Sequence, residues 1–339
     1  MARDLRLFLV GFGVVGQALA SLLLTRQEEI KRRIGQGLTV VGVVDSKSSV
    51  SDGEGLDLSK VLSIKKAKGS VGDQGTSSAV ELLPAVEADI IAELTPAGDS
   101  RAEPGLTHMK KALNSGMHVV TSNKMPLALA YTELLKKAKA RNLMIKYGAC
   151  VGAGIPVLEF GDACAVSDHV VRIDGVLNAT SNYILTKIEE KGVNFRDALA
   201  EAGKAGFAEA DPTLDIEGVD AACKIVILAN HVLGRDFSLK DVKVMEGIGG
   251  VTAPQVESAR KRASKIRMVA SVEDAPEVRV LELSETDPLA VDGARNAVKF
   301  KCKNSGDRVV MGEAAGGATT STAVLRDILA VGRELGERA

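Results

Sequence analysis

The feature that most constrains the fold of this chain is a glycine loop close to its first residue. Leu5–Val10 is an apolar run with the length of a buried strand, and the residues after it have the spacing Gly-x-Gly-x-x-Gly. An amphipathic segment that predicts a helix then runs to about Gln27. In such a strand–loop–helix the first glycine permits a tight turn, the second lets a ligand approach the backbone, and the third allows close packing of the helix. The motif predicts a dinucleotide-binding loop, with a purely structural turn as the alternative. The loop consists of Gly11, Phe12, Gly13, Val14, Val15 and Gly16.

The sequence up to residue 147 alternates short β-branched runs with helical stretches, the pattern of a parallel α/β sheet. It predicts a doubly wound Rossmann sheet. From Gly148 the pattern is less regular and predicts a second, α+β domain, while the last segment returns to glycine and a helix. We expect residues 1–147 and 307–339 to form the dinucleotide-binding domain and residues 148–306 the substrate domain. The Gly-, Ser- and Lys-rich segment 63–78 predicts a loop. The further strands expected in the sheet are Thr39–Val44, Asp89–Leu94, Met117–Thr121 and Leu143–Tyr147.

Composition excludes several classes of protein. The 339 residues are too many for one ordinary core, and 45% hydrophobic with 26% charged residues is typical of a globular protein. The 43 basic and 44 acidic residues leave a net charge of -1, which gives no electrostatic reason to bind nucleic acid or an acidic membrane. No apolar run reaches the ~18 residues of a membrane span, and four well-separated cysteines predict buried reduced thiols. We therefore expect a cytoplasmic protein without a nucleic-acid or membrane partner.

The end of the second predicted strand bears on the choice of cofactor. Asp45 stands where an acid binds the ribose hydroxyls of NAD, although it lies further past Gly16 than the usual ~20 residues. Ser46 and Lys47 follow at once and are suited to the 2′-phosphate of NADP. The sequence leaves NAD and NADP both open.

The most informative stretch for chemistry is the acid-rich segment before residue 224. Residues 205–223 contain five acids and no Lys or Arg, and the next residues form a segment that is apolar on all sides apart from Lys224. This pattern predicts a buried helix. Asp220 lies four residues before Lys224, the favoured orientation for a helical ion pair. A structural ion pair is one interpretation. A partly buried lysine is costly, however, and lysine suits the donation of a proton to a carbonyl oxygen that receives hydride, so we favour a catalytic role.

Several segments, in the same order along the chain, resemble the motifs of homoserine dehydrogenases, and the resemblance extends from about residue 5 to residue 330. The middle segments are specific, whereas the glycine loop is shared with many dehydrogenases. The segments are Thr121-Ser122-Asn123-Lys124, Val151-Gly152-Ala153-Gly154-Ile155-Pro156, Asn178-Ala179-Thr180-Ser181-Asn182-Tyr183-Ile184-Leu185, Gly206-Phe207-Ala208-Glu209-Ala210-Asp211-Pro212 and Asp215-x-x-Gly218-x-Asp220-Ala221-Ala222-x-Lys224.

The resemblance implies the reversible, NAD(P)-dependent interconversion of L-aspartate 4-semialdehyde and L-homoserine, a step toward threonine, methionine and isoleucine. Lys224 is similar to the proton-transferring lysine of the family, with Asp220 as its partner. Glu209 and Asp215 match the acids that hold the substrate, and Lys124 matches the lysine at the junction of cofactor and substrate. The resemblance adds three expected cofactor contacts, Thr95, Gly316 and Gly317.

The family also implies a homodimer and a monovalent-cation site, usually occupied by sodium. The matching backbone carbonyls belong to Gly148, Val151, Ala153 and Ile155. Gly148 stands where glutamate is usual, Ala179 replaces a glycine, and Phe207 stands where tyrosine is frequent. We expect no regulatory ACT domain and no fused aspartate kinase. The alternatives are another Rossmann dehydrogenase of amino-acid-like substrates and an inactive NAD(P)-binding sensor; Glu209, Asp220 and Lys224 together argue against the sensor.

Overall fold

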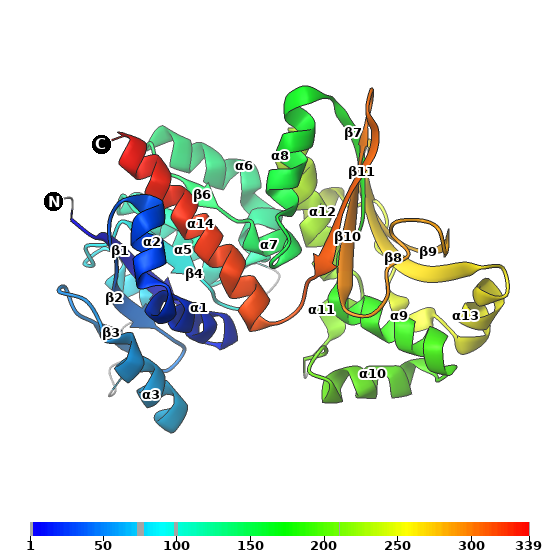
Figure 1. Ribbon diagram of the computed structural model, residues 1–339, viewed down its shortest axis with the longest axis horizontal. Coiled ribbons are helices and arrows are strands. Elements are labelled where there is room, and N and C mark those ends of the chain that lie inside the picture. Colours follow the sequence, from blue (N-terminus) through cyan, green and yellow to red (C-terminus); the bar gives the residue numbers. More distant parts are fainter. Residues whose placement is uncertain (1–2, 73–77, 98–100, 210, 339) are drawn as a thin grey trace. The chain divides into compact units, whose positions relative to one another are not determined.

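The computed structural model describes residues 3–72, 78–97, 101–209 and 211–338. The chain divides into two compact units (Figure 1). The first unit comprises Met1–Cys150 and Gly317–Ala339, and the second comprises Val151–Gly316.

The first unit contains a six-stranded sheet of order β3-β2-β1-β4-β5-β6. All strand pairs are parallel except that of β3 with β2. This is a doubly wound Rossmann sheet, as predicted, and its order reverses between β1 and β4, where such sheets bind ligands at the carboxyl ends of the strands. The strands are β1 (Leu5–Val10), β2 (Leu38–Val44), β3 (Ser49–Ser51), β4 (Ile90–Glu93), β5 (His118–Thr121) and β6 (Ile145–Lys146).

Helices bury the apolar strands of this sheet. Leu7, Phe8, Leu9 and Val10 of β1 are completely buried, as expected for a strand covered on both faces. Helix α14, near the end of the chain, packs against α1 and α2 and so completes the unit (Figure 1). The helices are α1 (Val14–Thr25), α2 (Gln27–Ile34), α3 (Leu58–Lys68), α4 (Ala79–Leu82), α5 (Gly105–Asn114), α6 (Lys124–Ala140), α7 (Ala149–Gly152) and α14 (Gly317–Arg338).

The loop predicted at 63–78 is wrong at its start, because α3 continues to Lys68. The Asp57 carboxylate accepts hydrogen bonds from the N–H groups of Ser59 and Lys60, which is an effective helix start, and Gly69 ends the helix with φ 69°. The lysines of this segment therefore lie on the last turns of a helix. Residues 73–77 of the predicted loop lie outside the described residues.

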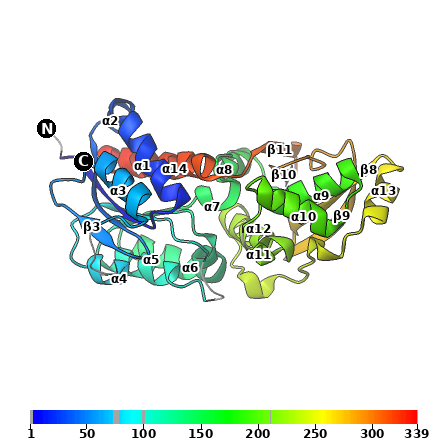
Figure 2. The same ribbon diagram turned by 90° about the horizontal axis from the view of Figure 1, so that it is seen from below.

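The second unit contains an antiparallel sheet of order β11-β10-β7-β8-β9. Helix α12 packs on β7, β8 and β9, and α9 lies beside α10 (Figure 2). The strands are β7 (Val170–Val176), β8 (Ser264–Val272), β9 (Pro276–Ser284), β10 (Arg295–Cys302) and β11 (Gly306–Glu313). The helices are α8 (Val157–Ser167), α9 (Ala179–Lys191), α10 (Phe195–Lys204), α11 (Thr213–Ile216), α12 (Val219–Val232), η1 (Leu239–Asp241), η2 (Ile248–Gly250) and α13 (Ala253–Arg260).

The predicted boundary at 306/307 lies too early in the chain. Residues 307–313 belong to β11, which pairs along its whole length with β10 of the second unit. The chain returns to the first unit only at Gly317. Glycines occur both in β11 and at the start of α14, so composition alone does not separate these two elements.

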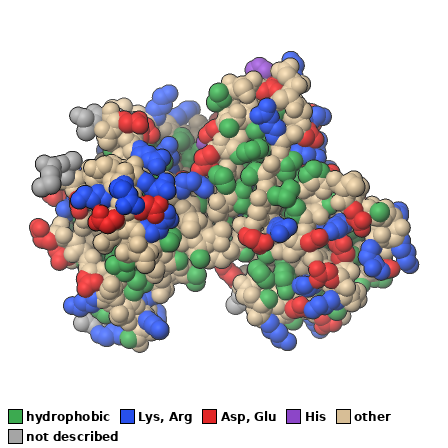
Figure 3. Space-filling model, viewed as in Figure 1, with side chains coloured by type: hydrophobic (Ala, Val, Ile, Leu, Met, Phe, Trp, Pro, Cys, Tyr) green, Lys and Arg blue, Asp and Glu red, His purple; other side chains and the backbone are tan. Residues whose placement is uncertain are grey.

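The surface agrees with the balanced composition. On the face drawn in Figure 3, acidic and basic side chains are intermixed over both units. Among the helices of the described residues, none is both long and apolar enough to span a bilayer. All four cysteines are free and buried, as predicted.

Candidate active site

The three glycines of the loop have distinct roles in the first unit. A Cβ on Gly11 would lie 2.7 Å from the carbonyl carbon of Leu94, and Gly11 has φ +98°. A Cβ on Gly16 would lie 2.4 Å from the Gly11 oxygen, whereas Gly13 has nothing within 4 Å. Gly11 and Gly16 therefore let the loop, the end of β4 and α1 pack closely, while Gly13 leaves open space beside the backbone. That space, at the start of α1, is suited to a pyrophosphate.

The start of α1 also contacts one of the predicted tail glycines. Helix α1 begins at Val14 and has no acidic residue in its first turn, so its positive end is not neutralised. A Cβ on Gly317 would lie 2.4 Å from the Val14 Cγ1 atom. The structure thus brings Gly317 to the glycine loop, and Gly316 before it adopts φ +98°.

The loop after β4 is held by a buried carboxylate. Glu93 is completely buried, its Oε2 atom lies 2.8 Å from Nδ1 of His108, and its Oε1 atom accepts hydrogen bonds from the N–H and the hydroxyl of Thr95. The Asn123 amide donates to the Thr95 hydroxyl over 3.3 Å. Asn123 also caps α6, whose first residue is Lys124. Two predicted site residues, Thr95 and Lys124, therefore lie at the same carboxyl edge of the sheet.

Asp45 is engaged inside the protein. Its Oδ1 atom accepts hydrogen bonds from the N–H groups of Lys47 and Ser48, and its Oδ2 atom lies 2.6 Å from Nζ of Lys65 on α3. The Asp45 side chain is only 4% exposed. Burial opposes its ionisation, but the hydrogen bonds from Lys65, Lys47 and Ser48 outweigh burial, and the pKa of Asp45 is lowered. The carboxylate expected to bind ribose is thus already paired, while Ser46 and Lys47 are exposed.

Lys224 lies in the second unit on the buried helix α12, as the sequence predicts. Residues 220–230 of this helix are buried except for Lys224, whose side chain is 14% exposed. Its Nζ atom lies 2.8 Å from Oδ2 of Asp220 and donates to the carbonyl oxygen of Leu177 over 2.6 Å. Neither the carbonyl of Leu177 nor its support by the Asn296 amide, at 3.0 Å, was predicted.

Asn178 joins the two predicted acids of this region. Its Nδ2 atom donates to Oδ1 of Asp215 over 2.6 Å and to Oδ2 of Asp220 over 2.8 Å. The pKa of Asp215 is raised, first by burial and then by the charge of Asp220. The sequence analysis named Asn178 only as part of a motif; a strand end followed by an asparagine at a helix start is the signal that identifies such a cap.

Glu209 does not join this cluster. Its side chain is exposed, and among the described residues it has no hydrogen-bond or ion-pair partner. The segment before it is anchored, because the Thr180 hydroxyl donates to the Phe207 carbonyl over 2.7 Å and the Phe207 ring lies 4.5 Å from that of Tyr183. Glu209 is therefore an exposed acid on a supported turn.

The residues of the expected cation site lie on the segment around α7. Ala153 has φ +47°, and the Ile155 carbonyl accepts a hydrogen bond from Val157 N–H over 2.8 Å. Gly148 N–H donates to Oδ2 of Asp327 over 2.7 Å, and a Cβ on Gly148 would lie 2.8 Å from Nη2 of Arg326. Neighbouring side chains thus occupy the space into which a glutamate at 148 would extend. In the described ranges, no group of three or more His, Cys, Asp or Glu side chains is placed to hold a metal.

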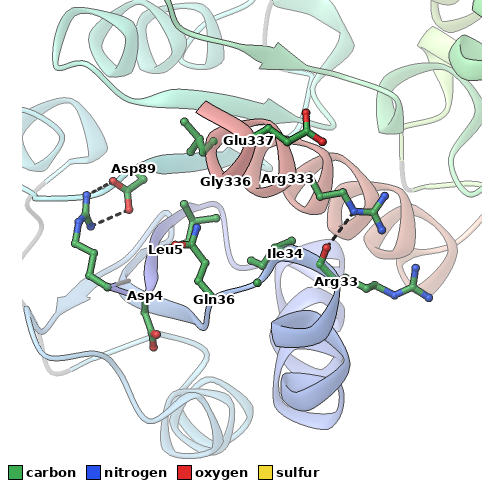
Figure 4. A pocket seen from close by; sticks show the side chains of 12 residues that line it. Asp4, Leu5, Arg33, Ile34, Gln36, Asp89, Arg333, Gly336 and Glu337 are labelled. Atoms are coloured by element: carbon green, nitrogen blue, oxygen red, sulfur yellow. Dashed lines mark hydrogen bonds and ion pairs between the residues drawn. The ribbon is translucent and has the colours of Figure 1, made fainter. Parts of the chain in front are cut away.

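A surface cavity of about 580 Å³ lies in the first unit, away from the glycine loop (Figure 4). It is lined by Leu5, the first residue of β1, so it lies at the amino ends of the strands, opposite to the edge where doubly wound sheets bind ligands. Two of its arginines already have partners: Arg3 is paired with Asp89, and Arg333 donates to the Arg33 carbonyl. This cavity is not part of the candidate site.

Sequence profiles cover most of the chain. Residues 11–147 match the profile described as "Homoserine dehydrogenase, NAD binding domain", and residues 156–329 match the profile "Homoserine dehydrogenase".

Individual proteins match over nearly their whole length. The homoserine dehydrogenase of Methanocaldococcus jannaschii is 36% identical over 328 residues, which are 95% of this chain and 97% of that protein. The NAD(+)-dependent homoserine dehydrogenase of Pseudomonas canavaninivorans is 35% identical over 340 residues, 96% of each chain. The crystal structure of a putative homoserine dehydrogenase from Archaeoglobus fulgidus superposes with a TM-score of 0.89 at 34% identity, covering 96% of this chain and 99% of the other.

Proposed function

Because this chain belongs to the homoserine dehydrogenase family, and so is an NAD(P)-dependent homoserine dehydrogenase of amino-acid biosynthesis, we propose how its own residues carry the reaction. The substrate pair is L-aspartate 4-semialdehyde and L-homoserine. Lys224 is the residue that gives the proton to the new hydroxyl group, and takes it back in the reverse direction. Bound NAD(P)H supplies the hydride from its nicotinamide ring.

The observation that carries this proposal is the set of contacts at the Lys224 ammonium group. A lysine ammonium has three N–H donors. Two are directed to acceptors that do not change during the reaction, Oδ2 of Asp220 and the Leu177 carbonyl. The third is left for the substrate oxygen. After proton transfer the neutral amine keeps both hydrogen bonds, so its lone pair points to the product hydroxyl and is ready to accept the proton again.

The acids around Lys224 account for recognition of the substrate's amino group. Asp215 is half-buried and carries a negative charge at a pH above its raised pKa, which makes it a strong partner for an ammonium ion. Glu209 adds a second carboxylate from its exposed turn. Lys124 is the lysine that lies where the substrate meets the cofactor. An inactive sensor would have no use for a lysine held by two fixed acceptors.

The test is the Lys224→Ala variant, compared with Lys187→Ala in the same unit. Lys187 is paired with Glu190 outside this cluster. Lys224→Ala should lose roughly 10²–10⁴-fold in turnover of homoserine, as loss of a general acid does, and should bind NADPH normally. Lys187→Ala should keep its turnover. Near-normal turnover of Lys224→Ala would remove the proton-transfer role.

The glycine loop and the segment after β2 form the cofactor site of the first unit in this proposal. Gly11–Gly16, Thr95 and the tail glycines contact the dinucleotide. Since Lys65 already neutralises Asp45, the exposed pair Ser46 and Lys47 is free to bind a 2′-phosphate. We therefore expect NADPH to be used at least as well as NADH.

Side-by-side measurement of kcat/KM with the two cofactors checks this preference. Lys47→Ala should lower kcat/KM for NADPH and leave that for NADH unchanged, whereas Lys60→Ala, an exposed lysine on α3, should change neither. Equal losses with both cofactors in Lys47→Ala would exclude a 2′-phosphate contact.

Three remaining proposals derive from the family resemblance. The carbonyls of Gly148, Val151, Ala153 and Ile155 would hold a sodium ion as a structural element, and replacing sodium by choline in the buffer should then lower thermal stability.

We also propose a homodimer, which light scattering on the purified protein tests. A biosynthetic enzyme that uses the NAD(P) pool is assigned to the cytoplasm.

A further inference from the structure

Both polar atoms of the Asn178 side chain have hydrogen-bond partners in the second unit. It is 4% exposed and caps α9, where its Oδ1 atom accepts a hydrogen bond from Ser181 N–H over 2.7 Å. Both hydrogens of its Nδ2 atom are donated, one to Asp215 and one to Asp220, over 2.6 and 2.8 Å. The cap fixes the amide plane, and the amide plane in turn fixes the positions of two carboxylates that belong to different helices.

The two carboxylates need such an arrangement because their tasks differ. The Asn178 amide and the Lys224 ammonium group both donate a hydrogen bond to the same oxygen of Asp220, Oδ2. Asp215 has no hydrogen bond to Lys224 and is open to another cation. Asp220 is buried and Asp215 is half-buried, and two neighbouring carboxylates repel each other. A neutral amide between them relieves the repulsion without supplying a competing positive charge.

We propose that Asn178 is a positioning residue of the active site: its amide holds Asp215 ready for the substrate's ammonium group and holds Asp220 on Lys224. This inference rests on the function proposed above and adds to it a residue that need not touch substrate or cofactor. Asn178 acts on binding through Asp215 and on turnover through Asp220, so its loss should change both KM and kcat.

Loss of the amide should also change the pH profile. The charged groups that face Asp215 are Asp220 and Lys224 from α12, and its hydrogen-bond partners are Asn178, the cap of α9, and Thr180 on α9. The hydrogen bond from Asn178 lowers the pKa of Asp215, against burial and the charge of Asp220. Without it, Asp215 becomes protonated at a higher pH, and binding of the substrate ammonium weakens first on the acid side.

The experiment compares Asn178→Ser with Asn182→Ser. Serine is an effective helix cap, so Asn178→Ser keeps the start of α9, but one short hydroxyl cannot bridge two carboxylates. Asn182 is a matched control, because it lies on the helix that Asn178 caps and is 1% exposed. It donates to the backbone carbonyls of Val291, Gly293 and Arg295, at and before the start of β10. Both changes remove a buried amide, one at the cap of α9 and one within it, and only Asn178→Ser removes it from the two acids.

Asn178→Ser should lose about 10- to 100-fold in kcat/KM for homoserine, the equivalent of one hydrogen bond to a charged group. The loss should be larger on the acid side of the pH–activity profile than on its alkaline side, and NADPH binding should be unchanged. Asn182→Ser should lower thermal stability without a pH-dependent loss. A loss in Asn178→Ser that is independent of pH, or no greater than that of Asn182→Ser, would overturn the inference. The Lys224→Ala variant separates the failure of this inference from the failure of the proposed function. If Lys224→Ala is inactive and Asn178→Ser is normal, only the positioning role of Asn178 is refuted.

Discussion

At the scale of single residues, the candidate site contains a charged carboxylate, Asp215, that lowers the stability of the folded protein. The pKa of Asp215 is raised from its ordinary value of 3.8 by burial and by the charge of Asp220. Above that raised pKa the ionised carboxylate costs folding free energy, because the unfolded chain ionises more easily. Stability contributed by this group is therefore present below about pH 3.8 and is lost as the pH rises through the folded-state pKa. Such costs are commonly concentrated where a protein functions.

Asp215→Asn should accordingly stabilise the protein while it impairs the enzyme. An asparagine still accepts the hydrogen bond from Asn178 but carries no charge beside Asp220. We expect a higher denaturation midpoint than wild type at about pH 7.5, a smaller difference at about pH 4.5, and a roughly 10-fold or greater loss of kcat/KM for homoserine from the missing ion pair. Asp211→Asn is the control, and it should change stability in the opposite direction. Hydrogen bonds from Thr213 lower the pKa of Asp211, so the charge of Asp211 stabilises the fold and its loss should lower the denaturation midpoint. A destabilised Asp215→Asn would show that its charge is not a cost.

Residue-level prediction from the sequence succeeded where a residue departs from its surroundings. Lys224 is the one charged side chain of an apolar segment, and its pairing with Asp220 follows from helical spacing alone. Asn178 and the Leu177 carbonyl contact this pair from a segment more than 40 residues earlier in the chain. The local sequence around Asn178 and Leu177 does not indicate these contacts. They depend on tertiary packing and can be seen only in the structure.

At the scale of elements, the glycine loop separates two kinds of glycine. The space where a Gly16 Cβ would lie is occupied by the Gly11 carbonyl oxygen, at 2.4 Å, whereas Gly13 faces open space. Gly16→Ala should therefore lower both stability and cofactor affinity. Gly13→Ala should leave the thermal midpoint nearly unchanged and raise the Kd for NADPH, because its methyl group enters the space left for pyrophosphate. Titration by nucleotide fluorescence together with thermal unfolding measures both quantities, and a Gly13→Ala variant that binds NADPH normally would contradict the assignment of that space.

Elements with strong periodicity were predictable, and those fixed by partners were not. The strand–loop–helix at the start and the buried helix α12 follow from apolar patterns. The three-residue strand β3 exists because it pairs with β2, and α3 extends because Asp57 caps it. Strand β11 belongs to the second unit because it pairs with β10, and composition cannot indicate such a partner.

At the scale of the whole molecule, the chain consists of two units with separate cores and separate parts of the chemistry. All of the proposed cofactor contacts except Gly316 lie in the first unit, and Lys224 with Asp220, Asp215 and Asn178 lies in the second. NADP⁺ at about 100 times its Kd should stabilise the unit that binds it by about 2.7 kcal/mol. Calorimetry should therefore show one unfolding transition that moves with NADP⁺ and another that moves with Asp215→Asn. A single transition that responds equally to both would show that the two units unfold together.

The return of the chain from Gly316 to Gly317 has a consequence for synthesis on the ribosome. Helix α14 contributes Ala323, Val324, Leu325, Ile328 and Val331 to the core around β1, and Asp327 binds the backbone of Gly148. The first unit to be translated is therefore the last to be completed, because it waits for a helix made after the whole second unit has emerged. Residues 151–316 form one continuous stretch and can fold first. During that interval the apolar surface of the nascent sheet that α14 later covers is exposed, and this is where a chaperone would bind.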